Sequence, residues 1–126
     1  MSQITTHILD TMKGKPAKGI NALLYQQENN ELPAAREPGW AGETGWREIA
    51  IGTTNKDGRI ADFLNKETVL EPGIYKIRFE TQEYFDKQSI QSFYPFVEIV
   101  FTISAKEHYH LPLLLSPFGY STYRGS

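Results

Sequence analysis

Short runs in which apolar and polar side chains alternate follow one another along the chain. The run over residues 4–10 alternates with a period of two, so Thr5, His7 and Leu9 share one face of a predicted strand. Residues 74–81 alternate in the same way. Residues typical of strands recur in six further segments, which predict strands over residues 19–27, 46–53, 59–63, 96–104, 108–116 and 120–123.

Glycine, proline, asparagine and aspartate mark the breaks between these strands. Residues 55–58 read Asn-Lys-Asp-Gly and predict a tight turn, because Asp-Gly tolerates the positive backbone angles that such turns need. Residues 12–19 and 72–73 predict further turns. Residues 82–91 contain no Gly or Pro and suit one or two helical turns. Residues 28–45 contain two Pro and three Gly without periodicity, which predicts a long loop of a kind that is often functional.

These elements predict an all-β fold: a two-sheet antiparallel β-sandwich of seven or eight short strands with one short helix. The chain has 126 residues and a mass of 14.4 kDa, which suits a single domain over residues 1–126. A domain of this size buries roughly two-thirds of the surface that its unfolded chain exposes.

Composition excludes several function classes. Thirteen Lys and Arg against fifteen Asp and Glu give a net charge of −2, which argues against a nucleic-acid-binding surface. The absence of cysteine rules out a disulfide scaffold, a thiol nucleophile and a Cys-ligated metal. No apolar run approaches the roughly 20 residues of a membrane span, and no basic start precedes an apolar stretch. We therefore expect a cytoplasmic protein that binds no membrane.

The only histidines are His7, His108 and His110. His108 and His110 lie two positions apart on a predicted strand and should point to the same face. Three interpretations stay open on these residues alone. The histidines are scattered surface residues, they are general acid and base groups, or they bind a catalytic zinc ion together.

Arg59 and the tail are further candidates. Arg59 follows the Asp-Gly turn and is either a solvated side chain or a two-pronged donor for a carbonyl or carboxylate group. The tail ends in Tyr123, Arg124, Gly125 and Ser126, and such ends usually fray unless they pack into a site. Nucleophile-triad, phosphate-loop and dinucleotide motifs are absent from the sequence. These residues by themselves leave the function of the sandwich open.

Three segments carry a specific resemblance. They read ITTHILDTMKGKPAKGI (residues 4–20), TNKDGRIADF (residues 54–63) and HYHLPLLLSPFGYSTYRGS (residues 108–126). With these segments the chain resembles the 5-hydroxyisourate hydrolases, the enzyme branch of the transthyretin-like family. The YRGS ending is the most specific part, because it distinguishes the hydrolases from the hormone carriers of the same fold.

The resemblance implies a transthyretin-like sandwich that assembles as a homotetramer, a dimer of dimers with active sites between the dimers. It implies hydrolysis of 5-hydroxyisourate to 2-oxo-4-hydroxy-4-carboxy-5-ureidoimidazoline in urate catabolism, by His-assisted attack of water on a ring carbonyl, with no cofactor and no metal. The residues that it assigns are His7, Arg59, His110 and Ser126 as catalytic, and Tyr123, Arg124 and Gly125 as substrate-binding. It gives His108 no principal role.

One departure and two alternatives accompany this interpretation. The family's loop at residues 28–45 is usually short, so this chain carries an insertion there, which includes Trp40. The first alternative is a small-molecule carrier on the same fold, which would not need His7, Arg59, His110 and the YRGS ending together. The second is a zinc-dependent hydrolase that uses the three histidines. In a eukaryotic cell the peroxisome is the alternative location.

Overall fold

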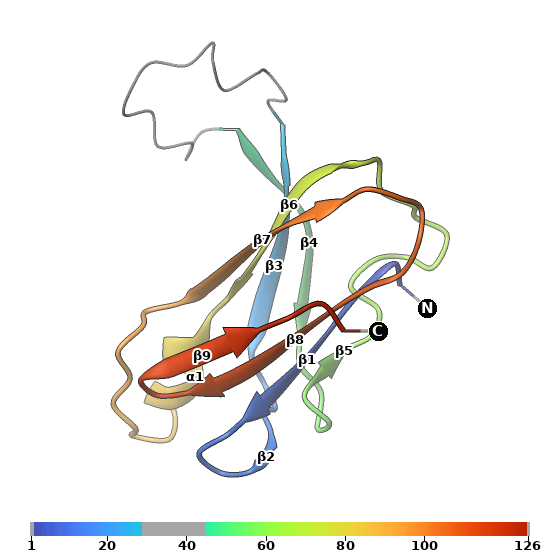
Figure 1. Ribbon diagram of the computed structural model, residues 1–126. Coiled ribbons are helices and arrows are strands. Elements are labelled where there is room, and N and C mark those ends of the chain that lie inside the picture. The colour runs from blue at the N-terminus through green and yellow to red at the C-terminus, as the bar shows by residue number, and fades with distance from the viewer. Residues whose placement is uncertain (1, 29–44, 126) are drawn as a thin grey trace.

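A computed structural model describes residues 2–28 and 45–125 of the chain. Two sheets face one another, and one short helix lies at the end of the sandwich (Figure 1). The elements, in chain order, are β1 (Ile4–Asp10), β2 (Lys15–Pro16), β3 (Asn21–Gln27), β4 (Trp46–Thr53), β5 (Arg59–Ile60), β6 (Gly73–Phe79), α1 (Thr81–Asp86), β7 (Val97–Ile103), β8 (Tyr109–Ser116) and β9 (Gly119–Thr122). The predicted all-β sandwich with one short helix is confirmed. Residues 29–44, and with them Trp40 and nearly all of the predicted loop, lie outside the described residues.

The first sheet has the order β2-β1-β8-β9, and the second has the order β4-β3-β6-β7. β5 also pairs with β1, so that the short strands β2 and β5 share one edge of β1 while β8 occupies the other. β8 runs parallel to β1 from Ile4 beside Tyr109 to Asp10 beside Leu115. The other strand pairs of the described chain are antiparallel, as predicted. A period of two shows which side chains share a face but not the direction of a neighbouring strand, so this parallel pair could not be predicted from it.

The core lies between the two sheets, and alternation decides which side chains enter it. In β8 the odd-numbered residues Tyr109, Leu111, Leu113 and Leu115 are buried, as the inner face requires. The largest fully buried side chains of the core come from both sheets and α1 and include Ile4, Ile8, Leu24, Tyr75, Ile77, Phe79, Phe85, Val97 and Ile103. The even-numbered positions of β8 and the odd-numbered positions of β1 are left on the outer face of the first sheet.

The predicted turn over residues 55–58 is present, but it joins the two sheets instead of forming a hairpin. β4 belongs to the second sheet, whereas β5 pairs with β1 in the first. Gly58 has a φ of +72°, which residues with a side chain adopt rarely, and a Cβ there would collide with the carbonyl oxygen of Ile8. This close approach lets the Ile8 amide donate to the Gly58 carbonyl at 2.7 Å. The turn therefore fixes β5 against the middle of β1.

The predicted short helix is present, and the first turn differs from prediction. Residues 82–91 were expected to hold one or two helical turns, and α1 has six residues, Thr81–Asp86; Ser89 has a φ of +58°, which is incompatible with a continued helix. The predicted 12–19 turn contains the two-residue strand β2. The two regions meet at Asp10, which is fully buried and accepts hydrogen bonds from the Met12 and Lys13 amides and, at 2.8 Å, from the Tyr84 hydroxyl. Burial, followed by the bond to Asp10, raises the pKa of Tyr84 to about 12.

Among the described residues no helix has both the length and the apolar character that a membrane crossing would require.

Candidate active site

The candidate site lies on the outer face of the first sheet. Thr5 and His7 alternate outward from β1, and His110 projects from the same face of β8 because it pairs in register with Thr5. The predicted grouping of Thr5 and His7 on one face is thus confirmed. His7 and His110 are both partly buried, whereas His108, just before β8, is exposed.

Arg59 reaches this face through the turn that precedes it. The Asn55 side-chain oxygen accepts hydrogen bonds from the Asp57 and Arg59 amides at 2.9 and 3.0 Å, which shapes the turn locally. Arg59 then pairs directly with His7 across the β1–β5 ladder. Cross-strand partners point to the same side of a sheet, so the guanidinium stands on the face that carries the histidines.

A buried hydroxyl joins two of the histidines. Thr5 is only 7% exposed, although it lies on the outer face. Its Oγ1 is 2.7 Å from Nε2 of His108 and 2.8 Å from Nδ1 of His110. The centroids of the two imidazole rings are 6.3 Å apart and their planes differ by 27°, so the two rings that contact Thr5 are nearly parallel. A hydroxyl has one proton, so Thr5 donates to one ring and accepts from the other.

Thr5, Arg59, His108 and His110 line one open pocket, with Thr6, Ile60 and Ala61 completing its wall. Burial lowers the pKa of His110 below its usual 6.5, and the positive charges of Arg59, His108 and His7 lower it further. Burial and Arg59 also lower the pKa of His7, against an opposing effect of Asp57. These effects favour the neutral form of both imidazoles, which is the form that can accept a proton from water.

The tail touches this site at one residue. Gly125 forms an isolated bridge with His110, and its amide donates to the His110 carbonyl at 2.8 Å. A Cβ built on Gly125 would lie 2.6 Å from Cδ2 of the His110 ring, closer than real Cβ atoms approach. The missing side chain is therefore what allows the tail to lie against the imidazole.

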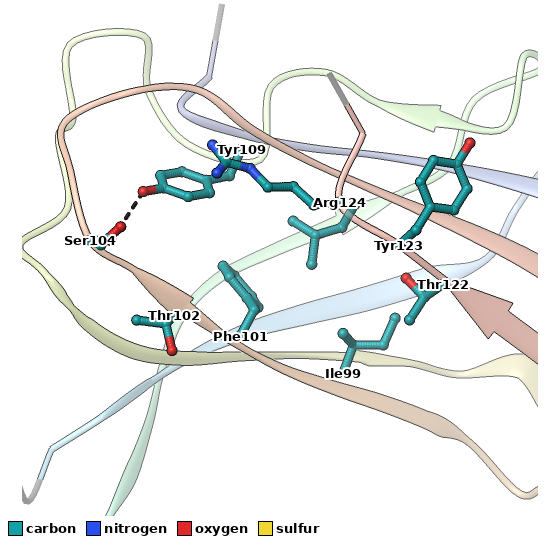
Figure 2. Close-up of a pocket in the computed structure, with 9 residues that line it drawn as sticks. Ile99, Phe101, Thr102, Ser104, Tyr109, Thr122, Tyr123 and Arg124 are labelled. Carbon is teal, nitrogen blue, oxygen red and sulfur yellow. Dashed lines mark hydrogen bonds between the residues drawn. The ribbon is translucent and has the colours of Figure 1, made fainter.

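Tyr123 and Arg124 are not among the residues that line the histidine pocket. They line a separate, mostly apolar pocket of about 260 Å³ between β7 and the β8–β9 hairpin (Figure 2). Arg124 lies over the ring of Tyr109, 4.3 Å from its centroid, and forms an exposed ion pair with Glu107 at 2.7 Å. The substrate-binding roles expected of Tyr123 and Arg124 stay predictions. Ser126, expected to be catalytic, lies outside the described residues.

The three histidines do not form a metal site in this arrangement. Within residues 2–28 and 45–125, no group of three or more His, Cys, Asp or Glu side chains is placed so that it could hold a metal ion. The geometry instead pairs His108 with His110 through Thr5, and His7 with Arg59. This arrangement does not support the zinc-dependent alternative.

Sequence reasoning missed the role of Thr5. The signal available was its period-two relation to His7, which placed it on the same face. Its contact with two histidines depends on the parallel register of β1 and β8, which joins residues 105 positions apart.

Comparisons with known proteins agree on one family. Residues 4–125 match the model of the HIUase/Transthyretin family. The 5-hydroxyisourate hydrolase of Mus musculus is 41% identical over 126 residues, covering 99% of this chain and 96% of the mouse protein. The solved structure of the Klebsiella pneumoniae 5-hydroxyisourate hydrolase aligns with a TM-score of 0.76 at 34% identity and 98% coverage of both chains. Sea bream transthyretin in complex with thyroxine aligns with a TM-score of 0.80 at 29% identity, covering 98% of this chain and 95% of the transthyretin.

Proposed function

Because the chain belongs to the HIUase/Transthyretin family, we propose that it hydrolyses 5-hydroxyisourate to 2-oxo-4-hydroxy-4-carboxy-5-ureidoimidazoline in urate catabolism. The relatives named as hydrolases cover almost the whole chain at about 40% identity, which agrees with the hydrolase interpretation of the sequence. The observation that carries the proposal is the gathering of His7, His110 and Arg59 on one face of the first sheet.

The reaction requires water to add to a ring carbonyl and the ring C–N bond to break. A neutral imidazole of His7 or His110 accepts a proton from water and later returns one to the leaving nitrogen. Negative charge develops on the carbonyl oxygen during the addition, and the Arg59 guanidinium is the cation on this face that can stabilise it. Gly125 keeps the tail against His110 and narrows the space in which a purine-derived ring would bind.

The carrier alternative has weaker support. Transthyretin shares the fold, so the fold itself does not separate a hydrolase from a carrier. A carrier has no need for His7, His110 and Arg59 to be kept together on one face of the sheet. That arrangement serves proton transfer, which favours the enzyme.

The test is a spectrophotometric assay on freshly made 5-hydroxyisourate, compared with its spontaneous decay. The wild-type protein should accelerate the loss of substrate. His110→Asn keeps a polar side chain of similar size but cannot shuttle a proton near neutral pH, so we expect a roughly 100-fold or larger loss of turnover without loss of folding. Acceleration that is equal in wild type and variant would exclude His110 from the mechanism. No acceleration by the wild type would refute the proposed function.

The homotetramer and the cytoplasmic location are part of the proposal. Tyr109, Leu111, Leu113 and Leu115 of β8 lie in the protein's own core, so the argument for a partner surface rests on the apolar side chains outside that core. Leu114 faces outward and is partly buried, and the β8–β9 hairpin also carries Phe118 and Tyr120, which are 64% and 42% exposed. Exposed apolar groups in one region are typical of interfaces. Light scattering should give four times the chain mass of 14.4 kDa, and a monomer at micromolar concentration would contradict the tetramer.

A further inference from the structure

We propose that Thr5 links His110 to His108 in a proton relay that connects the buried imidazole of the site with solvent. The inference rests on the proposed hydrolysis for its chemistry but on the described contacts for its geometry. It assigns two relay residues, Thr5 and His108, which act through His110 and need not touch the substrate.

The hydrogen bonds form a continuous chain. Nδ1 of His110 is 2.8 Å from the Thr5 hydroxyl, and that hydroxyl is 2.7 Å from Nε2 of His108. Thr5, in the middle of this chain, is 7% exposed, so water does not compete for its hydroxyl. His108, at the end of the chain, is exposed. Because Nδ1 of His110 is occupied by Thr5, Nε2 is the nitrogen left to face the substrate.

Two tautomeric states of this chain suit the two halves of the reaction. In the first state His110 Nδ1–H donates to Thr5, Thr5 donates to His108 Nε2, and His110 Nε2 carries a lone pair. In the second state every hydrogen bond is reversed, and His110 Nε2 carries the proton. The first state accepts a proton at Nε2, and the second state donates one there.

The proton count closes over one turnover. As the water oxygen bonds to the carbonyl carbon, His110 Nε2 takes a proton from the water and His110 Nδ1 passes its proton to Thr5. Thr5 passes its own proton to His108 Nε2, and His108 Nδ1 releases a proton to solvent. As the ring C–N bond breaks, Nε2 gives its proton to the leaving nitrogen, and one proton returns from solvent through His108 and Thr5. The carboxylic acid product then ionises in water.

Electrostatics explain why such a relay is useful. The charged groups that face His110 are Arg59 from β5, His7 from β1 and His108 beside its own strand, and when charged all three disfavour a positive imidazole. An isolated base at this position would have to hold two protons next to the Arg59 guanidinium. The relay moves the second proton outward to the exposed His108, where water solvates the charge.

The experiment compares Thr5→Val, which removes the hydroxyl but keeps the branched shape, with Thr5→Ser, which keeps the hydroxyl. Thr11→Val is the matched control, because it removes another threonine hydroxyl from the neighbouring segment, one that bonds only the Leu115 carbonyl. We expect kcat to fall roughly 10- to 100-fold in Thr5→Val, within the range of general acid–base contributions, and to stay within a few-fold of wild type in the other two. The dependence of kcat on deuterium content should be curved in the wild type and linear in Thr5→Val.

His108→Asn tests the relay at an exposed position where folding is not at risk. The kcat of His108→Asn should fall. Added imidazole should restore this kcat, because a small base can take the proton from Thr5; the rates are compared after the uncatalysed decay is subtracted. Wild-type kcat in Thr5→Val or in His108→Asn, or a loss in His108→Asn that imidazole does not restore, would overturn the relay.

A measurement without substrate separates this proposal from the proposed function. The ¹⁵N chemical shifts of the imidazoles report tautomers, and Thr5→Val should release His110 and His108 from their shared state. If the wild type fails to hydrolyse 5-hydroxyisourate, the proposed function falls, whereas unchanged ¹⁵N shifts in Thr5→Val refute the coupling itself.

Discussion

Gly125→Ala should disable the site through a single methyl group. The added Cβ would lie 2.6 Å from Cδ2 of His110 and 3.2 Å from Cγ of both His110 and Pro112, whereas ordinary contact begins at 3.4 Å. The His110 ring or the tail must therefore move by about 0.8 Å, the shortfall at Cδ2. A displacement near 1 Å in an active site can cost about 100-fold in rate, so we expect kcat to fall roughly 10- to 100-fold.

Stability should change little, because the tail can lift away at the loss of one amide hydrogen bond, worth about 1 kcal/mol. The control is Gly119→Ala in the same β8–β9 hairpin, where the added Cβ would meet only the Ser116 hydroxyl at 3.7 Å. Both variants are assayed on 5-hydroxyisourate, with the imidazole resonances of His110 recorded by NMR. Equal turnover in the two variants would show that the tail's position against His110 has no part in catalysis.

Three other predictions follow from charge and burial. Arg59→Met removes the positive charge that lowers the pKa of His7 and His110, so both values should rise partway toward 6.5, since burial remains. The acid limb of activity should move to higher pH with them, and an NMR titration without any shift would contradict this electrostatic role. Because folding lowers both pKa values, the unfolded chain binds more protons below pH 6.5, and the free energy of unfolding of the wild type should decrease as the pH falls through that region. Tyr84→Phe removes a hydroxyl donor from the fully buried Asp10 and should lower the free energy of unfolding by about 1–3 kcal/mol with kcat unchanged; an unaltered denaturation midpoint would refute it.

Much of the fold was predictable because local rules act on it. The alternation over residues 4–10 and 108–116 grouped Thr5 with His7, and His108 with His110, each pair on one face of its predicted strand. The structure shows that Thr5, His7 and His110 lie on the outer face of the first sheet. The Asp-Gly turn was predictable because the backbone angle at Gly58 is a local property. Long-range pairing is not local, so the sequence pattern did not predict that this turn carries the chain from one sheet to the other or that β1 and β8 run parallel.

The resemblance named candidate residues one by one, but it did not name the contacts between them. The resemblance supplied His7, Arg59 and His110, and the structure brings them to one face. It did not supply Thr5, because a threonine in a strand has an ordinary structural role that needs no explanation. The resemblance also did not predict that Arg124 lies over the ring of Tyr109, because the orientation of a tail depends on which partners are within reach.

The parallel pairing of β1 with β8 also has a consequence for how the protein comes to fold. The hydrogen bond between Thr5 and His110 closes a loop of 105 residues, so the site cannot exist while the ribosome is still making β8. Until then β1 has only the two-residue strands β2 and β5 as partners, and its apolar residues Ile4 and Ile8 have no neighbour on the other edge. Non-local topologies fold slowly and leave strand edges open to aggregation in the meantime. The nascent chain should therefore depend on protection of its first strand, and catalytic competence should arise only in the last phase of refolding.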